Sequence, residues 1–196
     1  MSALSEGARA GPLIVGIGGT VRPDSTSERA LVKALESAQA AGARTELFGG
    51  AFMASLPIYN PQAPGEHAPR TAFLDAVSRA DGLIVATPGY HGSLSGLVKN
   101  ALDSLEGLRD DPRPYFDGRA VGCIVAATGW QACGSALAAL RSIVHAMRGW
   151  PTPLGATLNT TQGLFDTAGE FTDRRDAWQV ETVAAQVVDF ARVWGK

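Results

Sequence analysis

The chain has 196 residues, a formal net charge of −2, 45% hydrophobic residues and 18% charged residues. This length predicts one domain, and the composition is that of a globular protein rather than a disordered one. The small net charge excludes the basic surface typical of nucleic-acid-binding domains, and it disfavours an electron carrier that docks through a strongly negative patch.

The aliphatic runs are only a few residues long, so no membrane span is predicted. Residues 1–12 lack the basic start and apolar run of a signal peptide. We therefore expect a flexible N-terminus over 1–12 and a single cytoplasmic domain over 13–196. The two cysteines, Cys123 and Cys133, have no Cys or His at metal-ligand spacing, which predicts buried thiols and no metal site.

Short aliphatic runs alternate with segments of helical period. In chain order we expect a strand at 13–17, a helix at 27–41, a strand at 44–48, a helix at 68–80, a strand at 82–87, a helix at 94–108, a strand at 119–128, a helix at 135–148, a strand at 154–159 and a helix at 173–194. Apolar strands alternating with amphipathic helices indicate a parallel sheet covered on both faces. The sequence therefore predicts a doubly wound, five-stranded α/β domain whose ligands bind beyond the carboxyl ends of the strands.

The loop after the first strand carries hydroxyl side chains and an arginine just before a helix. The candidate binding residues there are Thr20, Arg22, Ser25, Thr26 and Ser27. A helix N-terminus attracts anions, and an arginine adds a charge-assisted hydrogen bond, so this loop predicts a site for a phosphate ester. The alternative is a simple capping box made by Ser25 and Glu28, which leaves Thr20 and Arg22 unexplained.

Other phosphate-binding motifs do not match this loop. A dinucleotide fingerprint that starts at Gly16 would need glycine where Val21 stands. A Walker A loop needs a lysine, and a phosphatase loop needs a cysteine nucleophile, and neither residue type occurs here.

The segment 87–103, Thr-Pro-Gly-Tyr-His-Gly-Ser-Leu-Ser-Gly-Leu-Val-Lys-Asn-Ala-Leu-Asp, resembles the flavin loop of the NADPH-dependent FMN reductase family. That family includes FMN, quinone, azo-dye and chromate reductases. Its first loop has the pattern Ser/Thr-x-Arg-x-x-Ser-x-Ser/Asn/Thr, which Thr20, Arg22, Ser25 and Ser27 match. The resemblance spans residues 13–160 with the motifs in order, and it implies a flavodoxin-like fold with bound FMN.

The resemblance implies roles for the loops after the first and third strands. Thr20, Arg22, Thr26 and Ser27 would hold the FMN phosphate. The isoalloxazine ring would be lined by Pro88, Gly89, Tyr90 and His91, with Gly92 and Ser93 closing the turn. Glycine at 89 would let the backbone approach a flat ring. Alternatively, Ser93 is only the N-cap of the next helix and His91 is only a solvated loop residue. The family often has an acidic residue at the position of Gly89 and Asn at that of His91.

The segment 127–134, Ala-Thr-Gly-Trp-Gln-Ala-Cys-Gly, resembles the family's third flavin loop. The candidates are Thr128, Gly129, Trp130 and Gln131. Backbone N–H groups of Gly129 and Gln131 would bond the pyrimidine end of the flavin. Trp130 would flank the flavin or the nicotinamide, or pack on the surface. In the long loop 49–69, Tyr59 and Asn60 are weaker candidates, and a partner subunit's copy of this loop is an alternative neighbour of the flavin.

The implied activity is NAD(P)H-dependent FMN reduction. Hydride would pass from NADPH or NADH to flavin N5, and an acceptor would follow through the same pocket by ping-pong transfer, with no catalytic side chain and no metal. The alternatives are an FMN-bound reductase of quinones, azo compounds or metal oxyanions, a dehydrogenase of a dedicated small metabolite, and a flavodoxin-type electron carrier. The partner would be a small acceptor or a monooxygenase. The helix at 135–148 is apolar over a wide arc, which predicts a partner. The family commonly forms dimers or dimers of dimers, so the resemblance implies a homodimer or homotetramer.

Overall fold

The computed structural model describes residues 11–62 and 67–194, and its centre is a parallel sheet. The strand order is β2 (Arg44–Phe48), β1 (Leu13–Gly18), β3 (Gly82–Tyr90) and β5 (Ala120–Ala127), and all neighbours are parallel. The fifth position is shared by β6 (Trp150–Pro151) and β7 (Ala156–Asn159), which pair with the first and second halves of β5. The doubly wound α/β prediction is confirmed, but the last strand consists of two short pieces.

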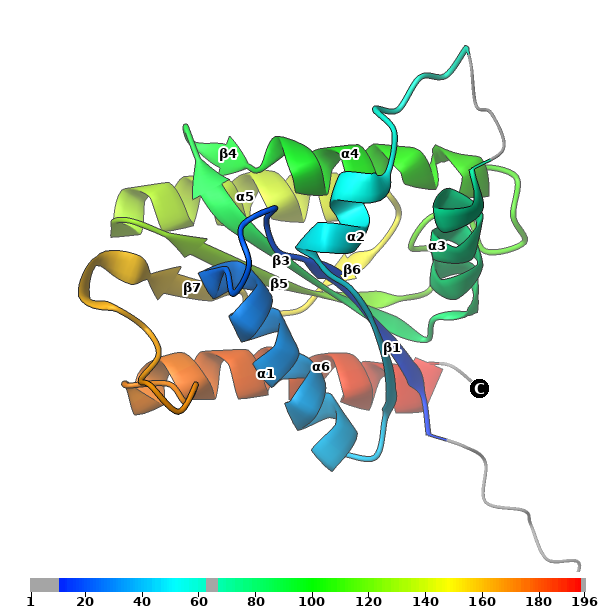
Figure 1. Cartoon of the computed structure of the whole chain (residues 1–196). Coiled ribbons are helices and arrows are strands. Elements are labelled where there is room, and N and C mark those ends of the chain that lie inside the picture. Colours follow the sequence, from blue (N-terminus) through cyan, green and yellow to red (C-terminus); the bar gives the residue numbers. More distant parts are fainter. Residues whose placement is uncertain (1–10, 63–66, 195–196) are drawn as a thin grey trace, which may run out of the picture.

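Helices cover both faces of the sheet (Figure 1). One face carries α1 (Thr26–Ala40) and α6 (Arg174–Trp194). The other carries α2 (Gly50–Ser55), α3 (Ala68–Arg79), α4 (Gly96–Ser104) and α5 (Trp130–Ala146). Two 3-10 turns, η1 (Leu105–Leu108) and η2 (Thr160–Gln162), follow α4 and β7. Each face has its own apolar core, as expected for a sheet buried on both sides.

Besides β6, the structure differs from the sequence prediction in three places near the carboxyl edge of the sheet. The loop at 49–69 contains the helix α2, whose six residues are too few to show a helical period. β3 continues beyond residue 87 into a hairpin with β4 (Ser93–Leu94). α5 begins at Trp130 instead of residue 135, so much of the predicted glycine-rich loop is helical. The N-terminus expected to be flexible, 1–12, lies outside the described residues except for residues 11 and 12.

Arg119 lies at the amino end of the sheet, and its side chain is fully buried. Its guanidinium donates hydrogen bonds to the carbonyl oxygens of Ser78 (2.6 Å), Ala80 (2.8 Å) and Tyr115 (2.7 Å). Burial lowers the pKa of Arg119 to about 10, so the group is still charged at neutral pH. These bonds join the insertion at 110–117 to the end of α3.

Both cysteines are buried and unpaired, as predicted. Burial raises the pKa of the Cys123 thiol to about 12, which makes it a poor nucleophile. No group of His, Cys, Asp or Glu side chains in 11–62 and 67–194 is arranged to hold a metal ion. None of the described helices has the length and apolar character needed to cross a membrane.

The apolar arc of α5 is used mainly inside the chain. Ala136, Leu140 and Val144 are buried, and the partly buried Leu137 and Ile143 pack against the same core. What remains exposed on the predicted arc is small, chiefly alanine. The width of this arc therefore does not by itself argue for a partner, contrary to the interpretation of the sequence.

Candidate functional site

The carboxyl ends of β1, β3, β5 and β7 surround a cavity of about 620 Å³. This position beyond the strand ends is the one expected for ligands of a doubly wound sheet. The cavity is lined by Thr20, Val21, Arg22, Ser25, Thr26, Ser27, Pro88, Gly89, Tyr90, Ala126, Ala127, Thr128 and Thr160. All five candidates of the first loop thus line this cavity. Val21, Ala126, Ala127 and Thr160 were missed, since no local motif marks them.

The first loop is folded tightly around its own backbone. Gly19 has a φ of 113°, and a Cβ there would lie 2.3 Å from Glu28 Oε2. Thr20 Oγ1 accepts a hydrogen bond from the Arg22 N–H at 3.1 Å. Ser25 is the N-cap of α1 and accepts from the Glu28 N–H at 3.4 Å. These contacts hold the loop open toward the cavity.

Only half of the alternative capping box is present. The Glu28 carboxylate does not return to the N-cap residue: its Oε2 accepts a hydrogen bond from the Gly50 N–H at 2.9 Å. A Cβ on Gly50 would lie 1.8 Å from the Thr20 carbonyl oxygen, so α2 packs directly against the first loop. Glu28 therefore ties the loop to α2, a role that no local motif could reveal.

Ser27 is the polar group that the fold leaves unsatisfied. Its side chain is 2% exposed, and its Oγ makes no hydrogen bond within the described residues. A buried hydroxyl without a partner costs about 1–3 kcal/mol. Arg22, by contrast, is exposed, and its guanidinium makes no hydrogen bond or ion pair to the described part of the chain. An unpaired hydroxyl, an uncommitted guanidinium and a helix N-terminus that line one cavity fit a phosphate ester, and hence the phosphate of FMN.

The second loop is a β-hairpin whose tip points away from the cavity. Tyr90 pairs with Ser93, and the two residues between them, His91 (φ 50°) and Gly92 (φ 82°), form a tight turn. His91, Gly92 and Ser93 do not line the cavity. The alternative role of Ser93 as a helix cap is wrong, because Ser95 caps α4 by accepting from the Val98 N–H at 3.2 Å.

The base of this hairpin forms a wall of small side chains. A Cβ on Gly89 would lie 2.8 Å from the Ala127 Cβ, so glycine lets β3 pack closely against β5 and α5 at a position that also lines the cavity. Pro88, Gly89, Ala126 and Ala127 together present little bulk, which leaves room for a flat ring. Tyr90 stands at the rim with 52% of its surface exposed.

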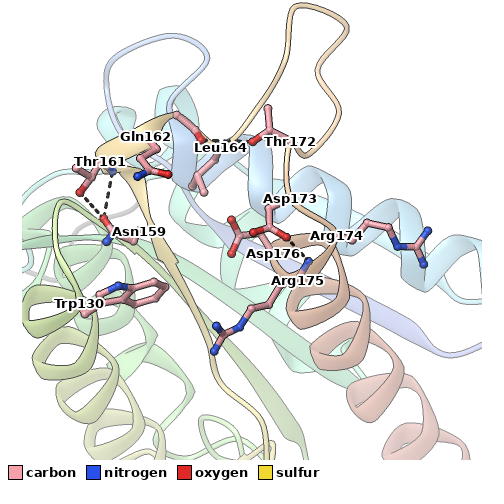
Figure 2. Close-up of a pocket in the computed structure, with 11 residues that line it drawn as sticks. Trp130, Asn159, Thr161, Gln162, Leu164, Thr172, Asp173, Arg174, Arg175 and Asp176 are labelled. Atoms are coloured by element: carbon pink, nitrogen blue, oxygen red, sulfur yellow. Dashed lines mark hydrogen bonds between the residues drawn. The ribbon is translucent and has the colours of Figure 1, made fainter.

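The third loop, at 128–131, is hydrogen-bonded to residues at the end of the neighbouring strand β7. The Gly129 N–H donates to Asn159 Oδ1 at 3.0 Å, so this predicted flavin donor already has a partner. Thr128 Oγ1 lies 3.1 Å from Thr160 Oγ1. Gln131 is an exposed residue in the first turn of α5 and lines neither this cavity nor its neighbour. Trp130 lines the neighbouring cavity, shown in Figure 2.

The remaining weak candidates also lie outside the cavity. The Tyr59 N–H donates to Asn100 Oδ1 at 2.8 Å, and the Asn60 side chain accepts from the Gln62 N–H at 2.9 Å. Neither Tyr59 nor Asn60 lines the cavity of this subunit.

Comparison with known proteins identifies the relatives of this chain. Residues 12–163 match the model of a family described as NADPH-dependent FMN reductase. An FMN-dependent NADPH-azoreductase from Staphylococcus aureus is 40% identical over 74 residues, which are 38% of this chain and 36% of that relative. The chain thus matches about a third of the length of that curated relative.

Solved structures match over nearly the whole chain. One is FerB, a flavoenzyme NAD(P)H:(acceptor) oxidoreductase from Paracoccus denitrificans, with a TM-score of 0.70, 22% identity, and coverage of 93% of this chain and 98% of that one. Another is an apo NADH:FMN oxidoreductase, with a TM-score of 0.69, 21% identity, and coverage of 93% and 90%. At this identity they confirm the flavodoxin-like fold. Because the family model covers most of the chain, the protein belongs to the NADPH-dependent FMN reductase family.

Proposed function

We propose that the chain binds FMN in the cavity at the carboxyl edge of the sheet and acts as an NAD(P)H-dependent FMN reductase. The observation that carries the proposal is the unpaired, buried Ser27 hydroxyl beside Arg22 at the N-terminus of α1. Membership of the NADPH-dependent FMN reductase family supports the same cofactor and the same source of electrons.

The chain's residues bind and orient the cofactor. Bound FMN supplies a ring that accepts hydride from reduced nicotinamide and passes electrons to an acceptor. Arg22 and the hydroxyls of Thr20, Ser25, Thr26 and Ser27 hold the phosphate. Pro88, Gly89 and Tyr90 would line the space for the ring, and Thr128 and Thr160 would border that space. The hydrogen bond from Gly129 to Asn159 holds the loops that carry Thr128 and Thr160 together without a ligand.

The electrons of reduced FMN can leave the site in two ways. In the first case FMN is a loosely held substrate, and reduced FMN leaves for a partner monooxygenase. In the second, FMN stays bound and a quinone or azo compound is reduced, which the identity to an FMN-dependent NADPH-azoreductase favours. Dehydrogenation of a dedicated small metabolite is a further variant. A flavodoxin-type carrier is disfavoured by the small net charge of −2.

We also propose a homodimer or homotetramer in the cytoplasm. Ile58 is 83% exposed at the tip of the 57–60 segment, where Asn100 Nδ2 donates to the Pro57 carbonyl oxygen at 3.0 Å. An ordered, exposed isoleucine fits a contact with a second subunit. Light scattering after gel filtration should give the mass of an oligomer, and a monomer mass would contradict the proposal.

The test is an anaerobic titration of FMN-loaded protein with NADPH and, separately, NADH. Stoichiometric loss of the oxidised-flavin absorbance is expected with at least one of them. An acceptor screen with FMN, a quinone and an azo dye then separates the two cases, and retention of FMN on desalting separates a bound cofactor from a substrate. Failure of the protein to take up FMN would overturn the proposed function.

A further inference from the structure

A second cavity, of about 690 Å³, lies directly beside the first (Figure 2). The segments 128–130 and 159–161 contribute to both cavities, with different residues facing each one. Thr128 and Thr160 line the first cavity, whereas Trp130, Asn159 and Thr161 line the second. The loops are joined by the contact between the Thr128 and Thr160 hydroxyls and by the bond from Gly129 to Asn159. Ligands in the two cavities would therefore be neighbours.

The outer wall of the second cavity lies almost wholly outside the part of the chain that matches the family model. It is built by residues 163–164 and 172–176, almost all beyond residue 163, where the match to the family model ends. The wall is held in place from α1. Arg29 lies over the Phe165 ring at 4.3 Å, and the Lys33 ammonium contacts Glu170 at 2.7 Å. The cavity is thus preformed rather than left to a loose loop.

The chemistry of the second cavity is that of an aromatic-binding site. The Trp130 side chain is 57% exposed and borders the space. In Figure 2 the Arg175 side chain extends from the start of α6 toward the space beside the indole, whereas Arg174 points away from it. Indole and guanidinium planes both stack on flat rings. Asn159 Oδ1 already accepts hydrogen bonds from the Gly129 N–H and from the N–H and hydroxyl of Thr161. The Asn159 Nδ2 amide and the Gln162 side chain are left to bond the edge of such a ring.

Charges of both signs surround the second cavity, because two arginines and two aspartates line it, although the Arg174 side chain points away from the space. Both aspartates also serve α6: Asp173 accepts from the Arg175 N–H at 2.8 Å, and Asp176 accepts from Gln179 Nε2 at 3.3 Å. Burial and the neighbouring Asp173 raise the pKa of the Asp176 carboxyl. A ligand with a high charge of either sign is therefore disfavoured here.

We propose that the second cavity is a binding site for a planar aromatic ring of low net charge that stacks on Trp130 and bonds through its edge. The proposal rests on the proposed function for the source of the ring. An aromatic electron acceptor and the adenine of a nicotinamide dinucleotide both bring such a ring, and both have to approach a flavin in the first cavity.

The test uses the full chain, with and without FMN, and two probes: menadione and adenosine. Titrations are followed by the indole N–H signals in ¹H–¹⁵N NMR spectra, with the Trp130 signal assigned from Trp130→Phe. We expect at least one probe to shift the Trp130 signal saturably. Trp130→Ala should raise the dissociation constant of that probe about fivefold, and Trp130→Phe should keep it within about twofold, since stacking on an aromatic ring contributes about 1 kcal/mol.

Trp178 provides a matched control, because it is 54% exposed but does not line the cavity. Trp178→Ala should leave both the probe affinity and the FMN affinity unchanged. A response to menadione alone assigns the site to the acceptor, and a response to adenosine alone assigns it to the dinucleotide; either supports the proposal. The proposal is overturned if neither probe shifts the Trp130 signal, or if Trp130→Ala has no more effect than Trp178→Ala.

FMN uptake, measured on the same samples, keeps the two proposals apart. A protein that takes no FMN but still binds a probe at Trp130 would overturn the proposed function and leave the second site standing. Normal FMN uptake with no probe bound at Trp130 would overturn the second site and leave the proposed function standing.

Discussion

Arg119 and Arg22 lie at opposite ends of the same sheet, and their guanidinium groups have opposite surroundings. Arg119 is buried at the amino end, where it donates to four backbone carbonyl oxygens. Arg22 is exposed at the carboxyl end and makes no side-chain bond within the described residues. The serines repeat the contrast, because Ser95 caps α4, whereas the equally buried Ser27 hydroxyl has no partner.

The contrast separates groups that hold the fold together from groups that are free to hold a ligand. A polar group whose hydrogen bonds are complete contributes to stability, and its loss leaves its partners unsatisfied. A group left incomplete at a cavity contributes little to stability and is available to a ligand. Substitutions at the two ends of the sheet should therefore affect different measurements.

The largest effect is expected at Arg119. Arg119→Met keeps most of the side-chain volume but leaves four carbonyl oxygens without their donor. We expect the free energy of unfolding to fall by at least about 3 kcal/mol. Urea unfolding checks this value, and Arg109→Met, which removes an exposed side chain that contacts Glu106 and Tyr115, should change it far less. If Arg119→Met lowered the free energy of unfolding by less than about 1 kcal/mol, Arg119 would not be the structural counterpart of Arg22.

The second effect is expected at Arg22. Arg22→Ala should weaken FMN binding by more than about tenfold, because a hydrogen bond to a charged group contributes about 1.5–3 kcal/mol. Its free energy of unfolding without FMN should stay within about 0.5 kcal/mol of the wild type. Isothermal titration with FMN checks the first value and urea unfolding the second. An unchanged dissociation constant would remove Arg22 from the phosphate site.

The smallest effect, at Ser27, has opposite signs in the two measurements. Ser27→Ala removes a buried, unpaired hydroxyl from a helix, so the chain without FMN should be more stable by about 0.5–1 kcal/mol. FMN binding should weaken about fivefold through loss of one hydrogen bond. Ser95→Ala is the matched control: it should lower stability by about 1 kcal/mol through loss of a cap and leave FMN affinity unchanged. If Ser27→Ala behaved like Ser95→Ala, the hydroxyl would be structural.

The sequence predicted the parts of this molecule whose signals are local. The alternation of apolar runs and amphipathic helices located the core of the sheet, and the hydroxyls beside Arg22 located the first loop of the cavity. It missed α2, which is too short to show a period, and β6, which has two residues. It also misplaced the start of α5, because the residues from Trp130 to Gly134 look like a flexible loop although they form its first turns.

The errors at the site have one physical cause: they concern partners that are distant in the sequence. Gly129 was expected to donate to a ligand, but Asn159 accepts its N–H from 30 residues away. Glu28 was considered only as part of a capping box, but it bonds Gly50 across 22 residues. Gly89 lines the cavity, and its missing side chain also makes room for Ala127, a contact that the sequence did not reveal. Each of these contacts depends on strand order and packing, which no local pattern encodes.

The attachment of the 163–172 segment to α1 has a consequence for how this protein can diversify. Its anchor points, Arg29 and Lys33, lie one and two turns beyond the start of the helix, clear of the hydroxyls that face the phosphate cavity. Insertions, deletions or grafted segments between Leu164 and Thr172 can reshape the second cavity while the first keeps every one of its lining residues. Natural variation or laboratory selection can therefore retune which molecules are accommodated there without rebuilding the part of the chain that would hold the cofactor.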